Sequence, residues 1–447
     1  MYRFRPFHIA LCTLILATAS HISMAATLCV NPAGSKNCYK TIQDAVNHAS
    51  ANDLIEVGAG TYTEEVTVGI PVSIVGAGAY ASIIDATNLA HGIFVDGYDH
   101  PGLNNVIIRG LTVENAQFEG IIVVSASDVT VNFNHIVNND KSSGLQFTGA
   151  LTGCPNQPGN GIYENDETGD CGGGLHLVGV ANSIVSDNLI SGNGDGLLIS
   201  DETAESHNNL VIHNIIQDNP FECGIVMASH PPANHTTPPF APHHGVDNNT
   251  IIDNVSVNNG LQGFGSGVGM FSDGAGQGRV SGNVVADNKL KHNGLGGVAL
   301  NTHVGPAFGL PVDNMSGNKI IGNDISGNLA DQDDTATPCR VGININSGDG
   351  GSPVRGTVIS HNVIRDEDVD IAVNTPVEVD IHLNDLLGAK VGVADVCAFD
   401  GATACTGKID ATQNYWGCAA GPGNSGCSTI DATGALYIPW LQKSIEP

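Results

Sequence analysis

Residues 188–200 read N-L-I-S-G-N-G-D-G-L-L-I-S, and this stretch contains the two patterns that decide the fold. The first pattern is N-x-[ILV]-x-x-N, which begins here at Asn188 and has Ile190 at its apolar position. The second is a glycine, here Gly196, followed by a short apolar strand. Both patterns recur along the chain. Such self-similarity predicts a repeat protein in which each unit buries its core only by stacking on its neighbours.

The asparagine pattern returns with some copies intact and some altered. The other intact copies begin at Asn134, Asn214, Asn288 and Asn323. One altered copy has Ser256 at the apolar position, and another ends in Glu367. The glycine strands begin at Gly120, Gly174, Gly196, Gly224, Gly267, Gly297 and Gly342. The shortest interval between these glycines is 22 residues, which is too short for a repeat of two helices.

An interval of this length fits one turn of a parallel β-solenoid with three short strands. Branched Ile and Val at alternating positions are typical of strands with one buried face. Because Asn tolerates left-handed backbone and bonds to neighbouring backbone groups, we expect the repeated asparagines at the corners of the coils. Stacked Asn side chains can also form ladders from coil to coil. The sequence therefore predicts an all-β parallel β-helix.

The N-terminus has the features of a secretory signal peptide. Arg3 and Arg5 are basic, residues 9–19 are apolar, and S-M-A at 23–25 resembles a small-x-small cleavage site. No other apolar run is long enough to span a bilayer. Removal of residues 1–25 leaves 14 Lys and Arg (16 minus 2) against 45 Asp and Glu, a net charge of −31. We therefore expect a secreted or periplasmic acidic protein.

Ten of the 11 cysteines follow the signal segment. An even number of cysteines in an exported protein favours disulfides over metal ligands. The pairs that lie close in sequence are Cys29/Cys38, Cys154/Cys171, Cys397/Cys405 and Cys418/Cys427. Cys223 and Cys339 remain as a fifth pair by elimination. Their strands lie three coils apart, roughly 14 Å at ~4.8 Å per coil, and a disulfide needs Cα atoms within about 7 Å, so the loop with Cys339 would have to fold back.

Both ends of the mature chain resemble a known family. Residues 41–49 form an amphipathic helical segment, and 53–62 read as a strand and a turn. This order is similar to the N-terminal cap of pectin lyase-like β-helix proteins. N-Y-W-G at 414–417 and I-P-W-L at 438–441 resemble the C-terminal closure of secreted bacterial members. The resemblance covers nearly all of residues 27–442 and implies a single-stranded right-handed parallel β-helix with a short N-terminal capping helix.

The resemblance is specific for the fold and weak for the chemistry, because this superfamily includes lyases, hydrolases, esterases, epimerases, adhesins and phage spikes. The G-H-G and R-x-K motifs of polygalacturonase-like sites are absent, and Y-D-H-P at 98–101 has the residue types of an epimerase motif in the wrong order. We expect a signal peptide at 1–25, a β-helix with its cap at 26–388, and a disulfide-rich closing segment at 389–447.

Four insertions interrupt the coils, at 140–173, 229–245, 303–313 and 329–340, and long connections on a rigid scaffold often carry function. Four candidate residues each lie six positions after the glycine that begins a strand. Counted from Gly196, Gly224, Gly267 and Gly297 of successive coils, they are Glu202, His230, Asp273 and His303. If the register holds, these residues form an acid–His–acid–His column with neighbours ~4.8 Å apart. A carboxylate beside an imidazole can orient it as a general base or complete a metal site, so the four are candidate catalytic residues. The alternative is that strand ends are simply polar.

The charge of the chain restricts its partners. The net negative charge disfavours binding of nucleic acid, and it disfavours binding of a polyuronate without a metal ion. Calcium that bridges carboxylates of the protein and the polyuronate could reverse the second argument. The negative charge can also serve only to keep a solenoid soluble and monomeric. Two functions remain open: a secreted lyase or hydrolase that acts on polysaccharide through the column, and a non-catalytic surface or adhesion scaffold that binds glycan or protein through its lateral loops. The sequence leaves open whether the protein is an enzyme, and it does not identify the substrate.

Overall fold

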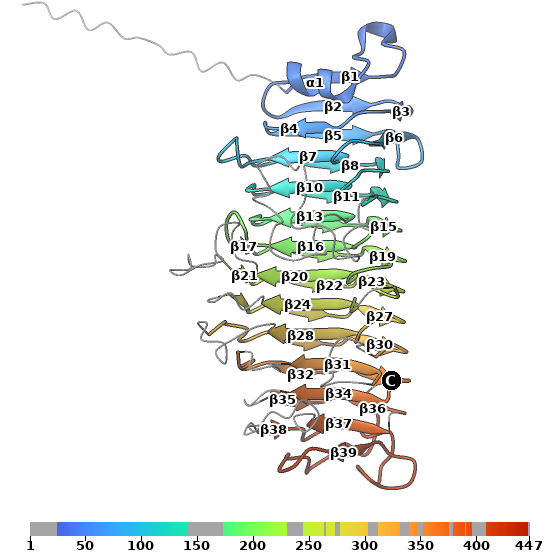
Figure 1. Ribbon diagram of the computed structural model, residues 1–447, viewed down its shortest axis with the longest axis vertical. Coiled ribbons are helices and arrows are strands. Elements are labelled where there is room, and N and C mark those ends of the chain that lie inside the picture. Colours follow the sequence, from blue (N-terminus) through green and yellow to red (C-terminus); the bar gives the residue numbers. More distant parts are fainter. Residues whose placement is uncertain are drawn as a thin grey trace, which may run out of the picture.

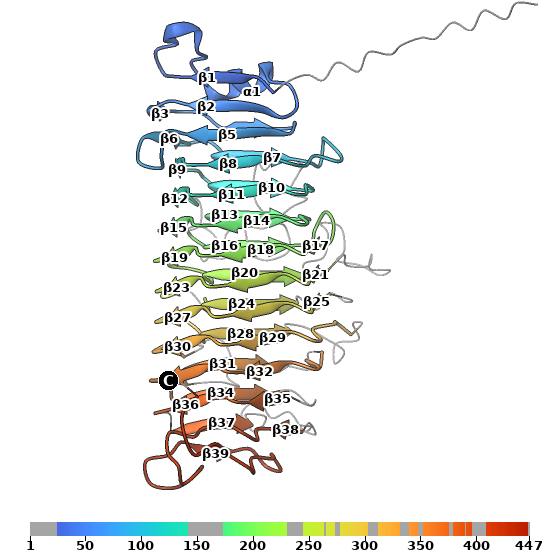
Figure 2. The same cartoon turned by 180° about the vertical axis from the view of Figure 1, so that it is seen from behind.

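Three parallel sheets form the walls of a solenoid that runs the length of the molecule (Figures 1 and 2). In a complete coil the chain passes once through each sheet, as in β10 (Ile121–Val124), β11 (Thr130–Asn132) and β12 (His135–Val137). Each strand pairs in parallel with its counterparts in the coils before and after. The computed structural model describes residues 25–141, 173–229, 245–262, 265–272, 278–302, 312–330, 339–346, 352–374, 379–388, 390–395 and 408–445. The expected all-β parallel β-helix with one short capping helix is confirmed.

One wall, here called the lateral sheet, has 12 strands within the described residues. In spatial order they are β4 (Val66–Val68), β7 (Ile93–Asp96), β10, β13 (Leu175–Val178), β16 (Leu197–Ser200), β20 (Ile225–Ser229), β24 (Val268–Ser272), β28 (Val298–Thr302), β31 (Val341–Asn346), β34 (Val369–Asn374), β37 (Val391–Asp395) and β39 (Thr429–Asp431). Its register is unbroken from β10 to β28, so equivalent residues of successive coils stack.

The described residues form two further long walls and one small sheet. The second wall contains β1 (Thr27–Val30), β2 (Asp53–Val57), β5 (Val72–Gly76), β8 (Ile107–Arg109), β11, β14 (Ile184–Ser186), β18 (Leu210–Ile212), β22 (Thr250–Ile252), β26 (Val284–Ala286), β29 (Lys319–Ile321), β32 (Val358–Ser360), β35 (Val379–His382) and β38 (Ile409–Asp410). The third contains β3 (Gly60–Tyr62), β6 (Ser82–Asp85), β9 (Thr112–Glu114), β12, β15 (Leu189–Ser191), β19 (Ile215–Gln217), β23 (Val255–Val257), β27 (Lys289–Lys291), β30 (Asp324–Ser326), β33 (Val363–Arg365) and β36 (Asp385–Leu387). The small sheet contains β17 (Ser206–His207), β21 (Val246–Asp247) and β25 (Val280–Ser281).

The core is one continuous column of aliphatic side chains inside the solenoid. Each wall contributes to it, as Val123, Val131 and Ile136 do in a single coil, and all three are buried. A single coil leaves the two open ends of this column exposed to water. Stacking on both neighbours removes that apolar surface, which is why the repeat is stable only as an array.

Asparagine side chains form ladders at the corners of the coils, as the sequence predicted. In each step the side-chain Nδ2–H donates to the Oδ1 of the asparagine in the next coil, at 2.8–3.3 Å. The first ladder consists of Asn134, Asn188, Asn214, Asn254, Asn288, Asn323, Asn362, Asn384 and Asn414. The second consists of Asn139, Asn193, Asn219, Asn259, Asn293 and Asn328 and ends at Glu367. A third links Asn209, Asn249, Asn283 and Asn318.

The left-handed backbone at these corners lies one residue earlier than expected. Asp187 and His213, with φ of 56° and 58°, directly precede the ladder residues Asn188 and Asn214. The ladder asparagines themselves have no positive φ, so the expectation that they supply the left-handed turn is wrong. The physical reason is the side chain: its amide bonds inward to neighbouring coils, and the residue before it turns the chain.

The N-terminal end of the column is closed by α1 (Ile42–His48), which confirms the expected capping helix. Ile42, Ala45 and Val46 are buried, and Thr41 caps the helix by accepting the Asp44 N–H at 3.1 Å. The carboxylate of Glu64 accepts two further N–H groups of the first turn, from Ile42 and Gln43, which satisfies donors that a helix leaves unpaired.

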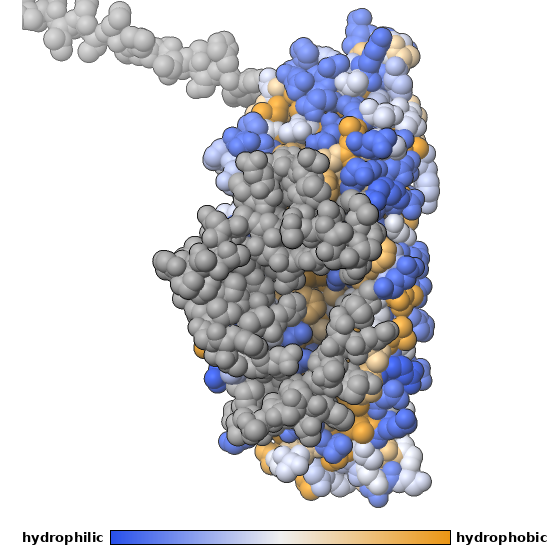
Figure 3. Space-filling model, viewed as in Figure 1, coloured by the Kyte–Doolittle hydropathy of each residue, from blue (hydrophilic) through white to orange (hydrophobic). Residues whose placement is uncertain are grey.

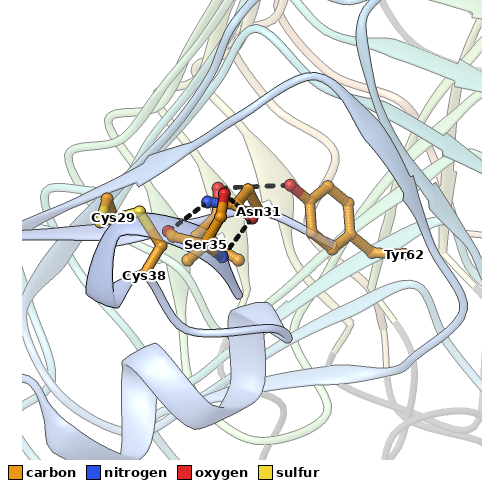
Figure 4. Close-up of a disulfide and its surroundings, with 6 residues drawn as sticks. Cys29, Asn31, Ser35, Cys38 and Tyr62 are labelled. Carbon is orange, nitrogen blue, oxygen red and sulfur yellow. Dashed lines mark hydrogen bonds between the residues drawn. A yellow bond between two sulfur atoms is a disulfide. The ribbon is translucent and has the colours of Figure 1, made fainter. Parts of the chain in front are cut away.

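A disulfide between Cys29 and Cys38 holds the loop beside this cap, which includes the short 3₁₀ turn η1 (Ser35–Asn37) (Figure 4). The side chain of Asn31 accepts the Ser35 N–H at 3.1 Å inside the same loop, and the Tyr62 hydroxyl donates to the Gly58 carbonyl at 2.8 Å. At the other end of the solenoid a second disulfide joins Cys418 to Cys427.

Two of the expected disulfides are thus confirmed, and one is wrong. Cys223 and Cys339 are both free, because their strands β20 and β31 are separated by β24 and β28. The pairs Cys154/Cys171 and Cys397/Cys405 lie outside the described residues, as does nearly all of the expected signal peptide.

The strands continue past residue 388, and the domain boundary expected there stays a prediction. β37, β38 and β39 pair with the coils before them, so the solenoid continues into the closing segment. Among the described residues, no helix combines the length and the hydrophobicity needed to cross a bilayer.

Candidate functional site

Strands β7, β10, β13, β16 and β20 of the lateral sheet are buried on both faces. In β13 the side chains of Leu175 and Leu177 belong to the solenoid core, whereas Val178 belongs to a separate cluster with Phe94 and Ile122 on the opposite side. Side chains therefore alternate between the core and an outer face. A polar side chain on this outer face cannot be explained by packing in the solenoid core.

A hydrogen-bonded chain of three side chains crosses the outer face at β13 and β16. His176 lies between the two core leucines of β13, and its Nε2 is 2.7 Å from the Oγ of Ser200 at the end of β16. The Ser200 hydroxyl donates to Oε2 of Glu202 at 2.5 Å. All three are buried, with relative exposures of 2%, 0% and 3%. The adjacent register of the two strands, with Val178 opposite Ser200, brings these residues together.

This arrangement assigns the proton positions. A serine hydroxyl has one hydrogen, and here it goes to the Glu202 carboxylate, so His176 must donate from Nε2. The carboxylate of Glu202 thereby orients the imidazole through the Ser200 hydroxyl. An oriented imidazole is a group that general acid–base chemistry uses.

Further titratable groups stand on the same face, in the turns that precede the strands. His91 Nδ1 lies 2.5 Å from Oε2 of Glu119, and the His91 ring lies 5.9 Å from the ring of Phe94. Asp195 and Cys223 occupy equivalent positions before β16 and β20, since each lies two residues before its strand. Ser266 donates its N–H to the Cys223 sulfur at 3.1 Å, and burial raises the pKa of this thiol well above its usual range. Cys223 is therefore a packed thiol and not a nucleophile.

The predicted acid–His column stays a prediction, although the strand register next to it can be described. The strand register it assumed is confirmed as far as Ser229, Ser272 and Thr302, which pair in neighbouring coils directly before His230, Asp273 and His303. Those three candidate residues lie outside the described part of the chain, so their convergence stays a prediction. Glu202 is described, and it carries the carboxylate of the hydrogen-bonded chain above.

Sequence reasoning missed His176 and Ser200. A signal for His176 was present, because a histidine between Leu175 and Leu177 must point away from the core if both leucines point into it. No such signal marked Ser200, since its role depends on the strand beside it. The described residues contain no group of three or more His, Cys, Asp or Glu side chains able to hold a metal ion, and the suggested calcium dependence stays untested.

A small cavity opens near β28 and β31. Ala299, Cys339, Val341 and Asn344 are among its lining residues, and its volume of about 10 Å³ is room for one water molecule. Burial raises the pKa of the Cys339 thiol, with the carboxylate of Asp368 adding to the effect.

Comparison with known proteins agrees with this fold. A family model described as a right-handed β-helix region matches residues 88–237. The chain is 14% identical to an alginate lyase from Paenibacillus sp. str. FPU-7, over 76% of this chain and 95% of that one, with a TM-score of 0.48. It is 14% identical to the pectate lyase Pel9A, over 86% and 82% of the two chains, with a TM-score of 0.47.

A third similar structure is the A-module of the mannuronan C-5 epimerase AlgE4 from Azotobacter vinelandii, at 14% identity, 79% and 91% coverage and a TM-score of 0.47. Comparison with curated protein sequences gave no match. The parallel strand pairing and the matched family model agree with the expected right-handed parallel β-helix.

Proposed function

We propose that this β-helix protein acts on polysaccharide at the outer face of its lateral sheet, by lyase- or hydrolase-type chemistry. The observation that carries the proposal is the hydrogen-bonded chain of His176, Ser200 and Glu202. A surface that repeats from coil to coil at ~4.8 Å suits an extended polymer with repeating units.

Each member of the chain has a distinct role in this proposal. His176 accepts or donates the proton at the reacting sugar, Ser200 positions the imidazole, and Glu202 stabilises the imidazolium that forms. Such an acid–base group contributes about 10²–10⁴-fold to a rate. His230, Asp273 and His303 are proposed to supply further acid–base groups from the next coils.

We also place the protein in an oxidising compartment, secreted or periplasmic. The disulfides at Cys29–Cys38 and Cys418–Cys427 support this, because such bonds persist mainly outside the reducing cytosol. The signal-like sequence at 1–25 supports it independently.

The test is to incubate the purified mature protein with a panel of neutral and acidic polysaccharides and to follow unsaturated products and reducing ends. We expect Ser200→Ala to lower any turnover at least ~100-fold, measured at a temperature at which circular dichroism shows that the variant is folded. Ser191→Ala, on the third wall, is the matched control and should leave turnover unchanged. Equal turnover in both variants would remove the role of the hydrogen-bonded chain. His230→Ala and Asp273→Ala should also abolish turnover if the predicted column is correct.

A second function has one observation in its favour. His176, Ser200 and Glu202 are almost fully buried, which restricts access of a substrate to them. In this alternative the protein is a non-catalytic extracellular scaffold that binds glycan or protein through its lateral loops. Retention on a polysaccharide without any product, unaffected by Ser200→Ala, would favour it.

A further inference from the structure

We infer that the polysaccharide recognised by the outer face is uncharged. The inference rests on the proposed function and adds the class of substrate. Three kinds of observation support it: the carboxylates on this face, the placement of the nearest cations, and a row of neutral amides.

Carboxylates recur along the outer face. Asp96 follows the alternation of β7 and points away from the core, as Phe94 does. Glu119 and Asp195 stand in the turns before β10 and β16, and Glu202 follows β16. All four are buried, with relative exposures of 5% or less, where screening by salt is weaker than at an open surface. Asp96 and Glu119 contact the side chains of His100 and His91. The carboxylates make this face less favourable for an anionic polymer than for an uncharged one.

The described cations nearest to the lateral sheet are bound to acids at its edges. The Nη2 and Nε of Arg279 contact Glu205 and Asp247 at 3.1 and 2.5 Å. Arg340 and Lys390 both contact Asp368, at 3.3 and 3.5 Å. Arg279 thus has two acidic partners, whereas Arg340 and Lys390 share the single carboxylate of Asp368. The sequence of the segments at 142–172, 230–244, 303–311 and 331–338 contains no lysine or arginine. The first and the last of these segments together contain seven Asp and Glu, and the other two contain none.

Neutral amides replace the carboxylates on the C-terminal half of the face. Asn301 of β28 lies directly opposite Asn346 of β31, and Asn344 lies on the same face of β31. The core residues Leu300, Ile343 and Ile345 alternate with them, which fixes their outward direction. An amide both donates and accepts hydrogen bonds, and so does a sugar hydroxyl. This part of the face therefore matches a polymer of hydroxyl groups better than one of carboxylates.

The experiment measures retention of the full mature protein on uncharged glucans, mannans, galactans and xylans, each compared with the carboxymethylated derivative of the same backbone. We expect at least one uncharged polymer to bind and its carboxymethylated form to bind at least ~10-fold more weakly at low salt. Added salt should change this difference only slightly, because salt screens buried charges weakly.

Substitutions of Asn301 test whether the polymer binds at the outer face. Asn301→Ala should weaken binding of the uncharged polymer by about 3- to 10-fold, the value of one hydrogen bond. Asn301→Lys should reduce the difference in affinity between the uncharged polymer and its carboxymethylated form, because it places a cation on the outer face. Asn132→Ala is the matched control: Asn132 is likewise half-buried and lies in a strand, but on the second wall.

The outcomes separate the inference from the function it rests on. Tighter binding of a carboxymethylated polymer or a polyuronate, with calcium or with EDTA, would overturn the uncharged class while keeping a polysaccharide function. Binding of no polysaccharide would overturn both.

Discussion

Each ladder asparagine uses nearly the full hydrogen-bonding capacity of its amide. The Oδ1 of Asn214 accepts both the N–H and the Nδ2–H of Asn188, at 3.0 Å each. Its own Nδ2 donates to the Val185 carbonyl at 2.9 Å and to Asn254 at 3.0 Å. Because these partners are buried, no water replaces the amide when it is removed.

Asn214→Ala should therefore lower the free energy of unfolding by about 3 kcal/mol, since each buried group left unpaired costs about 1–3 kcal/mol. Chemical denaturation followed by circular dichroism measures the change. Asn132→Ala, at a half-buried position outside the ladders, should change stability by no more than about 0.5 kcal/mol. Similar losses in the two variants would show that the ladder contributes nothing beyond an ordinary strand residue.

At the residue scale the sequence predicted the asparagine ladders, but it did not predict which corner residues adopt a positive φ. The recurring asparagines were visible, and their side-chain pairing followed from the repeat. The residues that adopt positive φ include Phe133 and Leu383, at 55° and 57°, and neither type favours that conformation. The stacked coils impose the turn there, so residue preference could not predict it.

At the scale of the strand, β34 departs from the repeat. Pairing of Ile343 with Ile371 and of Ile371 with Val393 places Asp370 between Gly342 and Gly392. A Cβ at Gly342 would lie 2.4 Å from the Ile364 side chain, so this position faces the interior. Asp370 is buried, neither of its carboxyl oxygens accepts a hydrogen bond from a described residue, and burial raises its pKa well above the usual range. The carboxyl of Glu367 adds to this effect.

The same coil contains a second perturbed carboxyl. Burial raises the pKa of Glu367 to about 7, although hydrogen bonds from Asn328 and the charge of Arg340 oppose the effect, and Asp366 adds to it. A carboxyl whose pKa is raised on folding binds more protons in the folded than in the unfolded state. Stability is therefore greatest below the ordinary pKa of 4.5 and declines as pH rises through about 7.

We expect Glu367→Gln to stabilise the C-terminal coils at pH 8 by about 3 kcal/mol and to change them little at pH 4, because a pKa difference of one unit corresponds to about 1.4 kcal/mol. Denaturation or hydrogen exchange across this pH range measures the difference. Asp366→Asn removes a charge from the neighbouring exposed residue and should have a much smaller effect. A Glu367→Gln effect that does not vary with pH would show that Glu367 is not the titrating group.

Of the four predicted site residues the structure describes only Glu202, and the predicted column stays a prediction. The glycine spacing fixed the strand register, and that register placed Glu202 on a coil beside further candidate residues. The chain of hydrogen bonds through Ser200 could not be foreseen, because it depends on the side-chain direction across two strands, which residue spacing does not encode.

At the scale of the whole molecule the repeat made the fold predictable, because each coil contacts mainly its two neighbours and the same local pattern recurs. The disulfide framework was less predictable. Close pairs such as Cys29 and Cys38 could be read from their spacing, but elimination wrongly joined Cys223 to Cys339. Solenoids keep distant coils apart, so elimination is a poor guide when cysteines are far apart in sequence.

The thiol count tests this framework. Without reductant we expect two free thiols per molecule, from Cys223 and Cys339, and they should react fully only after denaturation, with Cys223 the more protected. A thiol-specific reagent applied before and after unfolding measures this. Cys223→Ser and Cys339→Ser should each remove one thiol, and four or more thiols in the natural protein would contradict the proposed pairs.

The direction of the asparagine bonds has an electrical consequence. In every described step the amide hydrogen points toward the C-terminal end, so the amide dipoles of a ladder add, as peptide dipoles do along an α-helix. The positive end of the second ladder lies at Glu367, whose Oε1 accepts both the N–H and the side-chain N–H of Asn328. The Oε1 of Glu367 receives that field as the last acceptor of the ladder. Glu367 has no side-chain amide to align with the others, so the array of aligned amides stops at this residue.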